Sequence, residues 1–519
     1  MKKATKLQKY FLLRTELGLS TTVSLSATYS KKIFDPLNKD SQILLLKAIQ
    51  ALVYKYEALR VDFHPNLTSE VLTKDQCEDW DLEPLEKVEM GDVVKYLLRS
   101  DSAFDTNGVN ISTVNSACEK GQNTTTWQFE SAGEDFLDFV HSTNNAIKAG
   151  MGKPLWKLYI INENTACFNY HHAIADGISG VNFHDELKNR INEISKGILR
   201  IDDTVYGISS ADAANNFASN IVFKRGQKYK INGIQQYPTV SESDIIKEKP
   251  KLLFKMSMLF NHFLVPYFPN PIKRLFKDLD LFTLSPNPEK LAKFSHLLIN
   301  ISPKHLDKIL QACKINKVSV TIWLLTVLHF VLKDSFHQGS VRFCVPLNLR
   351  SIVPRKEYSD EYKIGLIISA FMSVFENTAL LMELNRQNLI IQAQQATKLL
   401  LAAQRDNYSQ QCQMNGMYNY IPSARDYILK EHNSSSDTPL KCSNLGYYKQ
   451  SLMPDNEEVA IEDMVFGSCG AAGCSLVSLY VISTKTNGAN LTFISPSTYK
   501  DSLDVVRENF VNVMDLILG

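Results

Sequence analysis

The chain has 519 residues, of which 44% are hydrophobic and 21% charged, and its formal net charge is +1. This composition is that of a globular protein long enough for two domains of roughly 200 to 250 residues, and the weak charge excludes a nucleic-acid partner. Nine cysteines occur without a Cys-x-x-Cys pair and without histidines at zinc-ligand spacing, so we expect reduced thiols and no metal site. The sequence has neither a signal peptide nor an uncharged apolar run of about 18 residues, so we expect neither secretion nor a membrane span.

The first part of the chain predicts two helices with a strand between them. Residues 7–14 carry apolar side chains at helical spacing and predict a short amphipathic helix. Residues 22–29 alternate strictly between apolar and polar side chains, which is the pattern of a half-buried strand. The long apolar stripe over residues 41–56 predicts a core helix. Residues 64–150 have little periodicity and give no functional signal.

The most informative segment joins two predicted strands to a predicted helix. Residues 155–161 and 166–170 have the composition of strands joined by a polar turn, and the apolar spacing over 179–194 predicts a helix. Between strand and helix, residues 171–177 read His-His-Ala-Ile-Ala-Asp-Gly. A histidine held at such a junction suits general-base catalysis, because its ordinary pKa is near 6.5 and its orientation is fixed.

The sequence leaves two roles open for Asp176. The His-x-x-x-Asp spacing is weak on its own, since on the order of one chain in two of this composition contains it by chance. The inference of a catalytic segment depends instead on its context, which is the doubled histidine, the glycine after Asp176 and the flanking strands and helix. Asp176 either orients the His172 imidazole, as the carboxylate of a catalytic triad does, or points away and pairs with an arginine.

The middle of the chain is polar over residues 195–251 and predicts a long crossover between two halves. Residues 252–268 then combine high apolar density with Lys273, Arg274 and Lys277 just beyond. This combination suits a segment that lies in a membrane interface. A helix packed on the second half, or one lining a substrate channel, is an equal alternative.

The second half of the chain opens as a new series of strands and helices. A strand, two helices and a second strand are predicted in turn at residues 294–302, 303–313, 318–332 and 341–346. Near the end, Asn487-Gly488 is typical of a two-residue hairpin turn, and an amphipathic helix closes the chain. We therefore expect an N-terminal half, a crossover and a C-terminal half, at residues 1–200, 201–290 and 291–519.

Residues 171–177 resemble the His-His-x-x-x-Asp-Gly signature of the CoA-dependent acyltransferase superfamily, which includes chloramphenicol acetyltransferase and peptide-synthetase condensation domains. More narrowly, the chain resembles the fungal alcohol acetyltransferase family, which also includes yeast N-acetyltransferases that confer resistance to inhibitors of sphingolipid synthesis. Residues 10–11 (Tyr-Phe) and 17–18 (Leu-Gly) match this family, whereas residues 463–467 (Asp-Met-Val-Phe-Gly) depart from the Asp-Phe-Gly-Trp-Gly of plant members. The resemblance implies a two-domain α/β fold like that of chloramphenicol acetyltransferase, with an active-site tunnel between the domains.

The resemblance also implies roles for single residues. His172, the second histidine of the pair, matches the catalytic base. Asp176 matches a structural carboxylate that pairs with an arginine, and Gly177 supports the same turn. Arg350 is the first candidate for the arginine and Arg60 the second, against the alternative that Arg350 is simply solvated.

Residues 442–446 (Cys-Ser-Asn-Leu-Gly) resemble the family's Ser-Asn-x-Gly segment beside the tunnel. Ser443 or Asn444 is expected to donate a hydrogen bond to the oxyanion formed during transfer, an interaction worth roughly 3 to 4 kcal/mol for one donor. An ordinary turn at a strand end is an equal alternative, because Ser, Asn and Gly are common turn residues.

The expected function is direct transfer of an acetyl group from acetyl-CoA to a hydrophobic acceptor. The acceptor is an alcohol, or a sphingoid-like amine such as an inhibitor of sphingolipid synthesis, in which case the reaction is a detoxification. Acetyl-CoA is a co-substrate, and no cofactor is expected to be bound permanently. We expect a monomer that faces the cytoplasm, with peripheral attachment to the endoplasmic reticulum or to lipid droplets. The alternative from another class is a non-catalytic, lipid-binding scaffold of the same fold.

Overall fold

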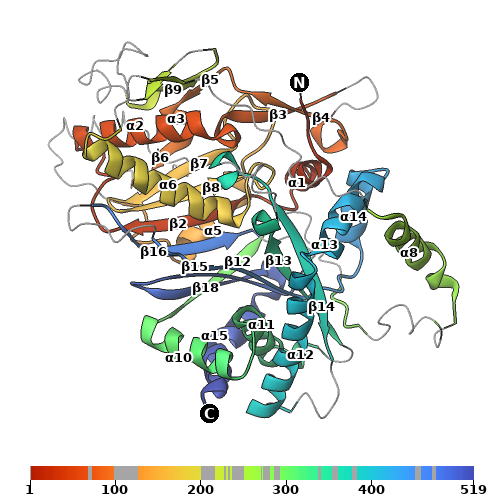
Figure 1. Cartoon of the computed structure of the whole chain (residues 1–519). Helices are drawn as coiled ribbons and strands as arrows, with labels where there is room; N and C mark the ends of the chain where they lie inside the picture. The colour runs from red at the N-terminus through yellow and green to blue at the C-terminus, as the bar shows by residue number, and fades with distance from the viewer. Residues whose placement is uncertain are drawn as a thin grey trace.

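Two large β-sheets, of five and six strands, organise the molecule, and helices cover each of them (Figure 1). This mixture of sheets and helices confirms the predicted α/β class. The computed structural model describes residues 2–67, 73–98, 127–199, 217–226, 229–231, 234–236, 250–269, 272, 281–285, 293–336, 340–352, 360–376, 383–450, 458–469 and 475–519.

The first sheet has the strand order β16-β2-β8-β7-β6. Its strands are β2 (Val23–Tyr29), β6 (Val94–Tyr96), β7 (Trp156–Asn162), β8 (Thr165–Tyr170) and β16 (Ile461–Ser468). Helices α2 (Lys39–Lys55) and α6 (Gly177–Ser195) cover one face of it. Leu25 of β2, Leu52 of α2 and Leu187 of α6 are fully buried in one shared core. Burial of these aliphatic side chains holds the two layers together.

Strand β2 is buried on both faces, which corrects the half-buried strand predicted for residues 22–29. Leu25 and its apolar neighbours face α2 and α6. Ser24 and Ser26 lie on the opposite face and are also buried. The polar side chains of β2 are therefore enclosed by protein instead of facing water, because other elements cover the second face of the sheet.

Strand β16 belongs to the first sheet although it comes late in the chain. It pairs with β2 in antiparallel register, with Met464 opposite Ala27 and Phe466 opposite Leu25. The predicted division at residue 291 is therefore wrong for this strand, which lies within the range 291–519 but completes the N-terminal sheet. The second half of the chain is thus hydrogen-bonded into the first.

The second sheet has the strand order β12-β18-β17-β15-β13-β14. Its strands are β12 (Phe294–Ile301), β13 (Val341–Asn348), β14 (Ile368–Phe375), β15 (Leu440–Tyr447), β17 (Val477–Thr484) and β18 (Gly488–Pro496). Strand β15 runs parallel to both of its neighbours, β13 and β17. The helices that share a core with this sheet include α10 (Pro303–Ile315), α11 (Val320–Val331), α12 (Arg386–Arg405) and α15 (Asp501–Asp515).

The hairpin predicted at Asn487-Gly488 is confirmed between β17 and β18, but its loop is longer than expected. Thr484 pairs with Gly488, so the loop comprises residues 485–487. Gly488 has φ +78°, a left-handed conformation that favours glycine. A side chain there would also collide with the backbone of Ile301, 2.0 Å from the position of a Cβ atom.

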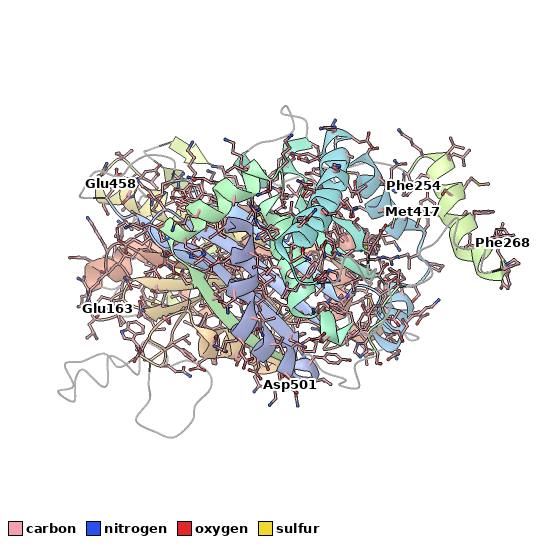
Figure 2. The ribbon with its side chains drawn as sticks, turned by 90° about the horizontal axis from the view of Figure 1, so that it is seen from below. Glu163, Phe254, Phe268, Met417, Glu458 and Asp501 are labelled. Carbon is pink, nitrogen blue, oxygen red and sulfur yellow. The ribbon has the colours of Figure 1, made fainter. Side chains whose placement is uncertain are left out.

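The remaining elements surround the two sheets. Helix α1 packs on α14, and α8 stands out from the body beyond α13, as the labelled Phe254 and Phe268 show in Figure 2. These elements are α1 (Lys6–Glu16), α3 (Met90–Val93), α5 (Glu134–Val140), α8 (Leu252–Phe263), α13 (Ser409–Met417) and α14 (Ala424–Asn433), with strands β1 (Lys2–Lys3), β3 (Val61–Pro65), β4 (Trp80–Pro84), β5 (Lys87–Glu89), β9 (Ile221–Lys224), β10 (Tyr229–Ile231) and β11 (Ile234–Gln236).

Within the described ranges, no single helix is both long enough and apolar enough to cross a membrane. Helices α10 and α11 have the length and apolar composition of a membrane span only when they are taken together, and the pair is bent by 99°.

Candidate active site

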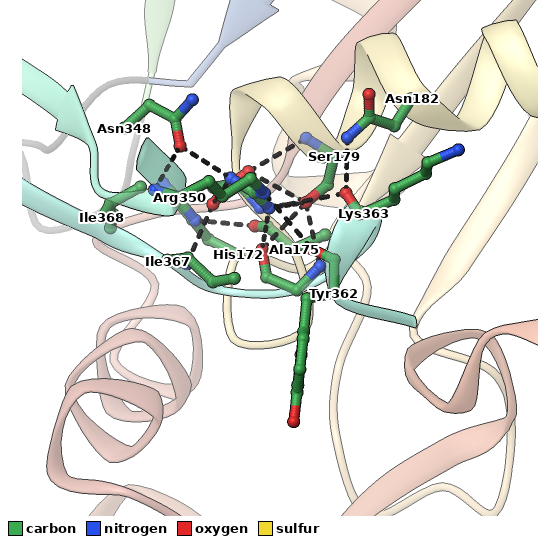
Figure 3. A network of polar contacts seen from close by, with 12 residues as sticks. His172, Ala175, Ser179, Asn182, Asn348, Arg350, Tyr362, Lys363, Ile367 and Ile368 are labelled. Atoms are coloured by element: carbon green, nitrogen blue, oxygen red, sulfur yellow. Dashed lines mark hydrogen bonds and ion pairs between the residues drawn. The ribbon is translucent and has the colours of Figure 1, made fainter. Parts of the chain in front are cut away.

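His172 lies in the turn between β8 and α6 (Figure 3). Its Nδ1 atom is 3.0 Å from the backbone carbonyl oxygen of Ala175. Because a carbonyl oxygen only accepts hydrogen bonds, Nδ1 carries the ring hydrogen and donates it. The other ring nitrogen, Nε2, therefore keeps its lone pair and can accept a proton.

The neighbouring His171 has the opposite tautomer. Its Nδ1 accepts a hydrogen bond from the backbone N–H of Ala173 at 3.0 Å, so the ring hydrogen is on Nε2. His171 is fully buried, whereas His172 is only half-buried. Of the two adjacent histidines, only His172 therefore combines access with a free lone pair on Nε2.

Phe11 of helix α1 stacks on the imidazole of His172. The ring centroids are 4.1 Å apart and the planes are inclined by 22°. This contact and the hydrogen bond to Ala175 together fix the orientation of the imidazole, because one restrains a ring face and the other a ring edge. Helix α1, at the start of the chain, thus acts as a positioning element for His172.

Replacing Phe11 by leucine is expected to lower kcat about tenfold, because a stacked aromatic pair contributes roughly 0.5–1.5 kcal/mol beyond its buried area. Phe11→Tyr keeps the stacked ring and should restore kcat. Phe129 is a matched control, since it is also half-buried and lies in an aromatic cluster with Phe136 and Phe139. Steady-state kinetics that show equal kcat losses for Phe11→Leu and Phe129→Leu would refute the positioning role.

The surroundings of His172 keep its imidazole neutral. Burial lowers its pKa, the positive charge of Lys441 on β15 lowers it further, and the resulting pKa is about 4. Burial also lowers the pKa of His171, to about 3. At neutral pH, His172 is therefore in the unprotonated form that a general base requires.

Asp176 caps helix α6, and its carboxylate hydrogen-bonds to residues other than His172. Its Oδ1 accepts hydrogen bonds from the backbone N–H and the hydroxyl of Ser179, both at 2.9 Å. Its Oδ2 accepts from Arg350 Nη1 at 2.8 Å and from the backbone N–H of Ile367 at 2.9 Å. Burial by itself raises the pKa of Asp176, but Arg350 and these hydrogen bonds outweigh it and lower the pKa below its ordinary value. Of the two roles left open by the sequence, the contacts are those of a structural carboxylate.

Arg350 is the partner of Asp176, as the first of the two predicted candidates. The residue is buried, and it also donates from Nη2 to Ser179 Oγ and to the carbonyl of Gly365, both at 3.1 Å (Figure 3). Arg350 thus joins helix α6 to the segment that precedes β14. The second candidate, Arg60, donates instead to the carbonyls of Val53 and Tyr54 at the end of α2.

Gly177 allows strands of the second half to approach the start of α6. A Cβ atom there would lie 2.7 Å from Leu445 Cδ2 on β15 and 3.0 Å from Phe466 Cζ on β16. These separations are shorter than van der Waals contact. Gly177 therefore supports the turn by close packing, next to the carboxylate that caps the same helix.

Ser443 and Asn444 lie on opposite faces of β15, so the structure does not bring both side chains to one site. Asn444 donates to Thr321 Oγ1 of α11 at 3.1 Å and accepts from the backbone N–H of Gly446 at 2.8 Å. It lines an apolar cavity of about 420 Å³ between β15, β17 and the helices of the second sheet. Ser443 is paired with Tyr480, whose ring packs on Phe466 of the first sheet, so Ser443 faces that sheet. Both hydrogen bonds of Asn444 are thus made within the second half of the chain, and of the two predicted oxyanion donors Ser443 is the one that faces the first sheet.

Comparison with known proteins places these residues in a family. A family model described as "Alcohol acetyltransferase" matches residues 3–517. The chain belongs to the alcohol acetyltransferase family. Membership makes it an acyltransferase and implies acetyl-CoA as co-substrate and a small molecule as acceptor. A 54-residue segment is 43% identical to the probable alcohol acetyltransferase crmB of Aspergillus fumigatus, and this match covers 9% of the chain and only 12% of that relative.

Solved structures share the fold of this chain. The TRI3 trichothecene 15-O-acetyltransferase of Fusarium sporotrichioides is 12% identical, with a TM-score of 0.59, and the match covers 100% of this chain and 95% of that one. The first condensation domain of the CDA synthetase is 11% identical, with a TM-score of 0.52 over 100% of this chain and 96% of that one. At these identities the likeness concerns the fold alone, and it confirms the predicted two-domain architecture.

Several buried polar atoms beside the tandem histidines form no hydrogen bond with a described residue. They are Nε2 of His171, Oγ1 of Thr22 and both amide atoms of Asn169, whereas the hydroxyl of Ser24 lies within reach of the Cys167 thiol. Asn169 lies opposite Ser24 across β8 and β2, on the sheet face turned away from α2 and α6. Since buried polar atoms are rarely left unpaired, these groups can hydrogen-bond a substrate or water.

The family motif identified His172, but the sequence alone predicted no role for several residues that lie near it. Phe11 was noted as an apolar position in an amphipathic helix and as part of the Tyr-Phe pair that matches the family, but neither observation gave it a role. Lys441 sits in a strand without any motif of its own. Asn169 gave one usable signal, which is a polar residue enclosed by apolar ones in a strand that leads directly to the histidines.

Proposed function

We propose that the protein transfers an acetyl group from acetyl-CoA to the hydroxyl or amino group of a hydrophobic acceptor, with His172 as the general base. The observation that carries this proposal is the fixed tautomer of His172, in which Ala175 holds Nδ1 and Nε2 keeps its lone pair. A base positioned in this way contributes about 10²- to 10⁴-fold in rate.

The proposed reaction is a direct transfer. Nε2 of His172 takes the proton from the acceptor while the acceptor oxygen or nitrogen attacks the carbonyl carbon of the thioester. The bond between that carbon and sulfur then breaks, and the proton passes from Nε2 to the departing sulfur. The products are the acetylated acceptor and the free thiol of CoA, without an acetylated enzyme. Orientation of the two bound substrates supplies rate beyond that of the base.

We assign the oxyanion contact to Ser443 and the contact with the pantetheine arm to Asn169, Ser24 and Thr22. Ser443 supports the first assignment because it faces the first sheet, on the same side of β15 as Lys441, whose charge acts on His172. The other three residues are neutral donors and acceptors. Such groups suit the amide groups of pantetheine better than the phosphates of CoA, which favour positively charged partners.

The surroundings of His172 support a hydrophobic acceptor. Phe11 stacks on His172, Tyr10 lies 5.5 Å from Phe11, and Tyr418 lies 5.6 Å from Tyr10, measured between ring centroids. We call Phe11, Tyr10 and Tyr418 the aromatic row. An alcohol or a sphingoid-like amine, such as an inhibitor of sphingolipid synthesis, presents the apolar surface that these rings favour. Acetylation of an inhibitor of this kind would make the protein a detoxifying N-acetyltransferase.

Release of the CoA thiol tests this function. Purified protein is incubated with acetyl-CoA and a panel of alcohols and long-chain amino alcohols, and free thiol is followed with each acceptor and without one. We expect release that depends on at least one hydrophobic acceptor. If the same compounds bind but none gives thiol release, the proposal fails and the chain is a non-catalytic, lipid-binding scaffold.

The pH dependence of kcat/KM should reveal the lowered pKa of His172. The base works only when unprotonated, so with a pKa of about 4 an alcohol acceptor should give a constant kcat/KM from pH 8 down to about 5, and a decrease below that. Removing the charge in Lys441→Met should move this decrease to higher pH. Enzyme held at each pH and assayed at pH 7 controls for acid unfolding. A decrease of kcat/KM centred near pH 6.5 in the wild type would contradict the lowered pKa of His172.

A further inference from the structure

Helix α8 exposes large aliphatic side chains to solvent. It stands apart from both sheets, at the edge of the molecule in Figures 1 and 2. Leu252, Leu253, Met256 and Leu259 are 73%, 85%, 58% and 48% exposed. Leu252, Met256 and Leu259 are spaced by four and three residues and lie on one stripe of the helix surface, and Leu253 widens this stripe because it lies three residues before Met256. An apolar stripe left in water on a projecting helix marks a surface that binds something.

The charges around this stripe favour an anionic partner. Lys251 precedes the helix and Lys255 lies on its surface, while residues 250–269 contain no aspartate or glutamate. Tyr267, which is 86% exposed, follows the helix and combines an apolar ring with a polar hydroxyl. Apolar side chains flanked by lysines, with an aromatic ring at one end, form the combination by which helices lie in the interface of an anionic membrane.

Helix α8 is also connected to the active site. The backbone N–H of Lys251 donates to Gln413 Oε1 of α13 at 3.0 Å, and Lys255 Nζ lies 4.5 Å from the ring centroid of Tyr420. Tyr420 ends the short 3₁₀-helix that begins at Tyr418, the outer member of the aromatic row. The exposed helix is therefore anchored next to aromatic residues that lead to His172.

We propose that α8 docks on the surface of an anionic phospholipid membrane and turns the aromatic row towards it. The docking proposal depends only on the exposed apolar stripe and on Lys251 and Lys255. Delivery of membrane-dissolved acceptors to His172 rests, in addition, on the proposed function. Peripheral attachment of this kind fits the expected location at the cytoplasmic face of the endoplasmic reticulum or at lipid droplets, and it deepens the proposed function by naming the acceptors as membrane-partitioned amphiphiles.

Flotation of the full-length protein with vesicles tests the docking. We expect the wild type to float with vesicles of phosphatidylcholine and phosphatidylserine, and to float less with phosphatidylcholine alone or in high salt. Interfacial binding scales with buried apolar area, so serine at all four exposed positions of α8 should weaken binding by about tenfold or more. A matched control replaces four exposed aliphatic residues elsewhere, which are Ile198, Ile315, Leu399 and Leu401.

The outcomes separate docking from catalysis. The docking proposal holds if the α8 variant loses flotation, the control variant keeps it, and thiol release with a short, water-soluble alcohol is unchanged in both. It fails if the α8 variant floats like the wild type, or if the wild type self-associates in light scattering without lipid and this association is lost in the α8 variant. Failure of thiol release in every protein would overturn the proposed function and leave the flotation result standing.

Discussion

Replacing His172 by alanine is expected to lower kcat/KM for acetyl transfer by about 10²- to 10⁴-fold, the usual contribution of a positioned general base. The loss should appear in kcat, because Nε2 acts on the proton only as the acceptor attacks. The substrates should still bind, since the aromatic row and the polar groups on β2 and β8 remain in place. Initial rates of thiol release over a range of acceptor concentrations, with circular dichroism as a check of folding, measure the effect.

His184 provides a matched control for this variant. It is a buried histidine whose pKa burial also lowers, to about 4, but Tyr29 and the carbonyl of Leu25 occupy its two ring nitrogens at 2.8 and 2.7 Å. His184→Gln should lower the melting temperature and leave kcat per folded molecule near that of the wild type. If His172→Ala keeps more than about a tenth of the activity, the base has been assigned to the wrong residue, because the loss expected for a base is larger.

Local patterns were sufficient to predict the elements that carry the motif. The predicted helix at 179–194 corresponds to α6, and the hairpin at Asn487-Gly488 was found with a longer loop. Both rest on signals that lie within a few residues, namely the spacing of apolar side chains and the conformational freedom of glycine. The same signals marked His172, since its position between strand and helix is itself local.

Contacts between distant parts of the chain could not be predicted in this way. No local pattern indicated that residues 461–468 form a strand of the first sheet, and only the folded chain shows that β16 completes the sheet of β2. The alternation of β2 indicates one polar face, but whether water or protein covers that face depends on elements elsewhere. The tautomers of His171 and His172 depend on single hydrogen bonds to the backbone, which leave no trace in residue types. Which of Ser443 and Asn444 faces the first sheet depends on the alternation along β15 and on the elements that cover each face of its sheet.

The ion pair between Asp176 and Arg350 joins the motif of residues 171–177 to the second half of the chain. The two residues are 174 positions apart in the chain, and both side chains are buried. Asp176 caps the helix that follows His172, while Arg350 reaches Gly365 and Ser179 as well. The pair therefore fixes the turn that holds the base and at the same time ties α6 to the second half of the chain. Replacing either partner should therefore lower the free energy of unfolding more than it lowers the rate of acetyl transfer.

Breaking this pair is expected to lower the free energy of unfolding by about 3 to 5 kcal/mol, because the remaining partner becomes an uncompensated buried charge. Asp176→Asn leaves Arg350 unpaired, and Arg350→Met leaves Asp176 unpaired. The double variant should lose less than the sum of the single losses, since it removes both charges together. Because the pKa of Asp176 is lowered in the folded protein, its contribution is complete above the ordinary carboxyl pKa and is lost as the pH falls below it. Urea titrations at pH 7 and at lower pH measure these differences.

The exposed pair of Arg225 and Glu86, 2.7 Å apart, shows what an ion pair contributes without burial. Glu86→Gln should change stability by less than about 1 kcal/mol, because water screens both charges. The comparison also separates structure from chemistry at Asp176. If Asp176→Asn kept the stability of the wild type but lost activity, the carboxylate would act on the imidazole after all, and the hydrogen bonds to Arg350, Ile367 and Ser179 would be incidental. Loss of stability with activity retained in the molecules that remain folded is the result that its geometry requires, since Ser179, Arg350 and Ile367 occupy both oxygens of the carboxylate.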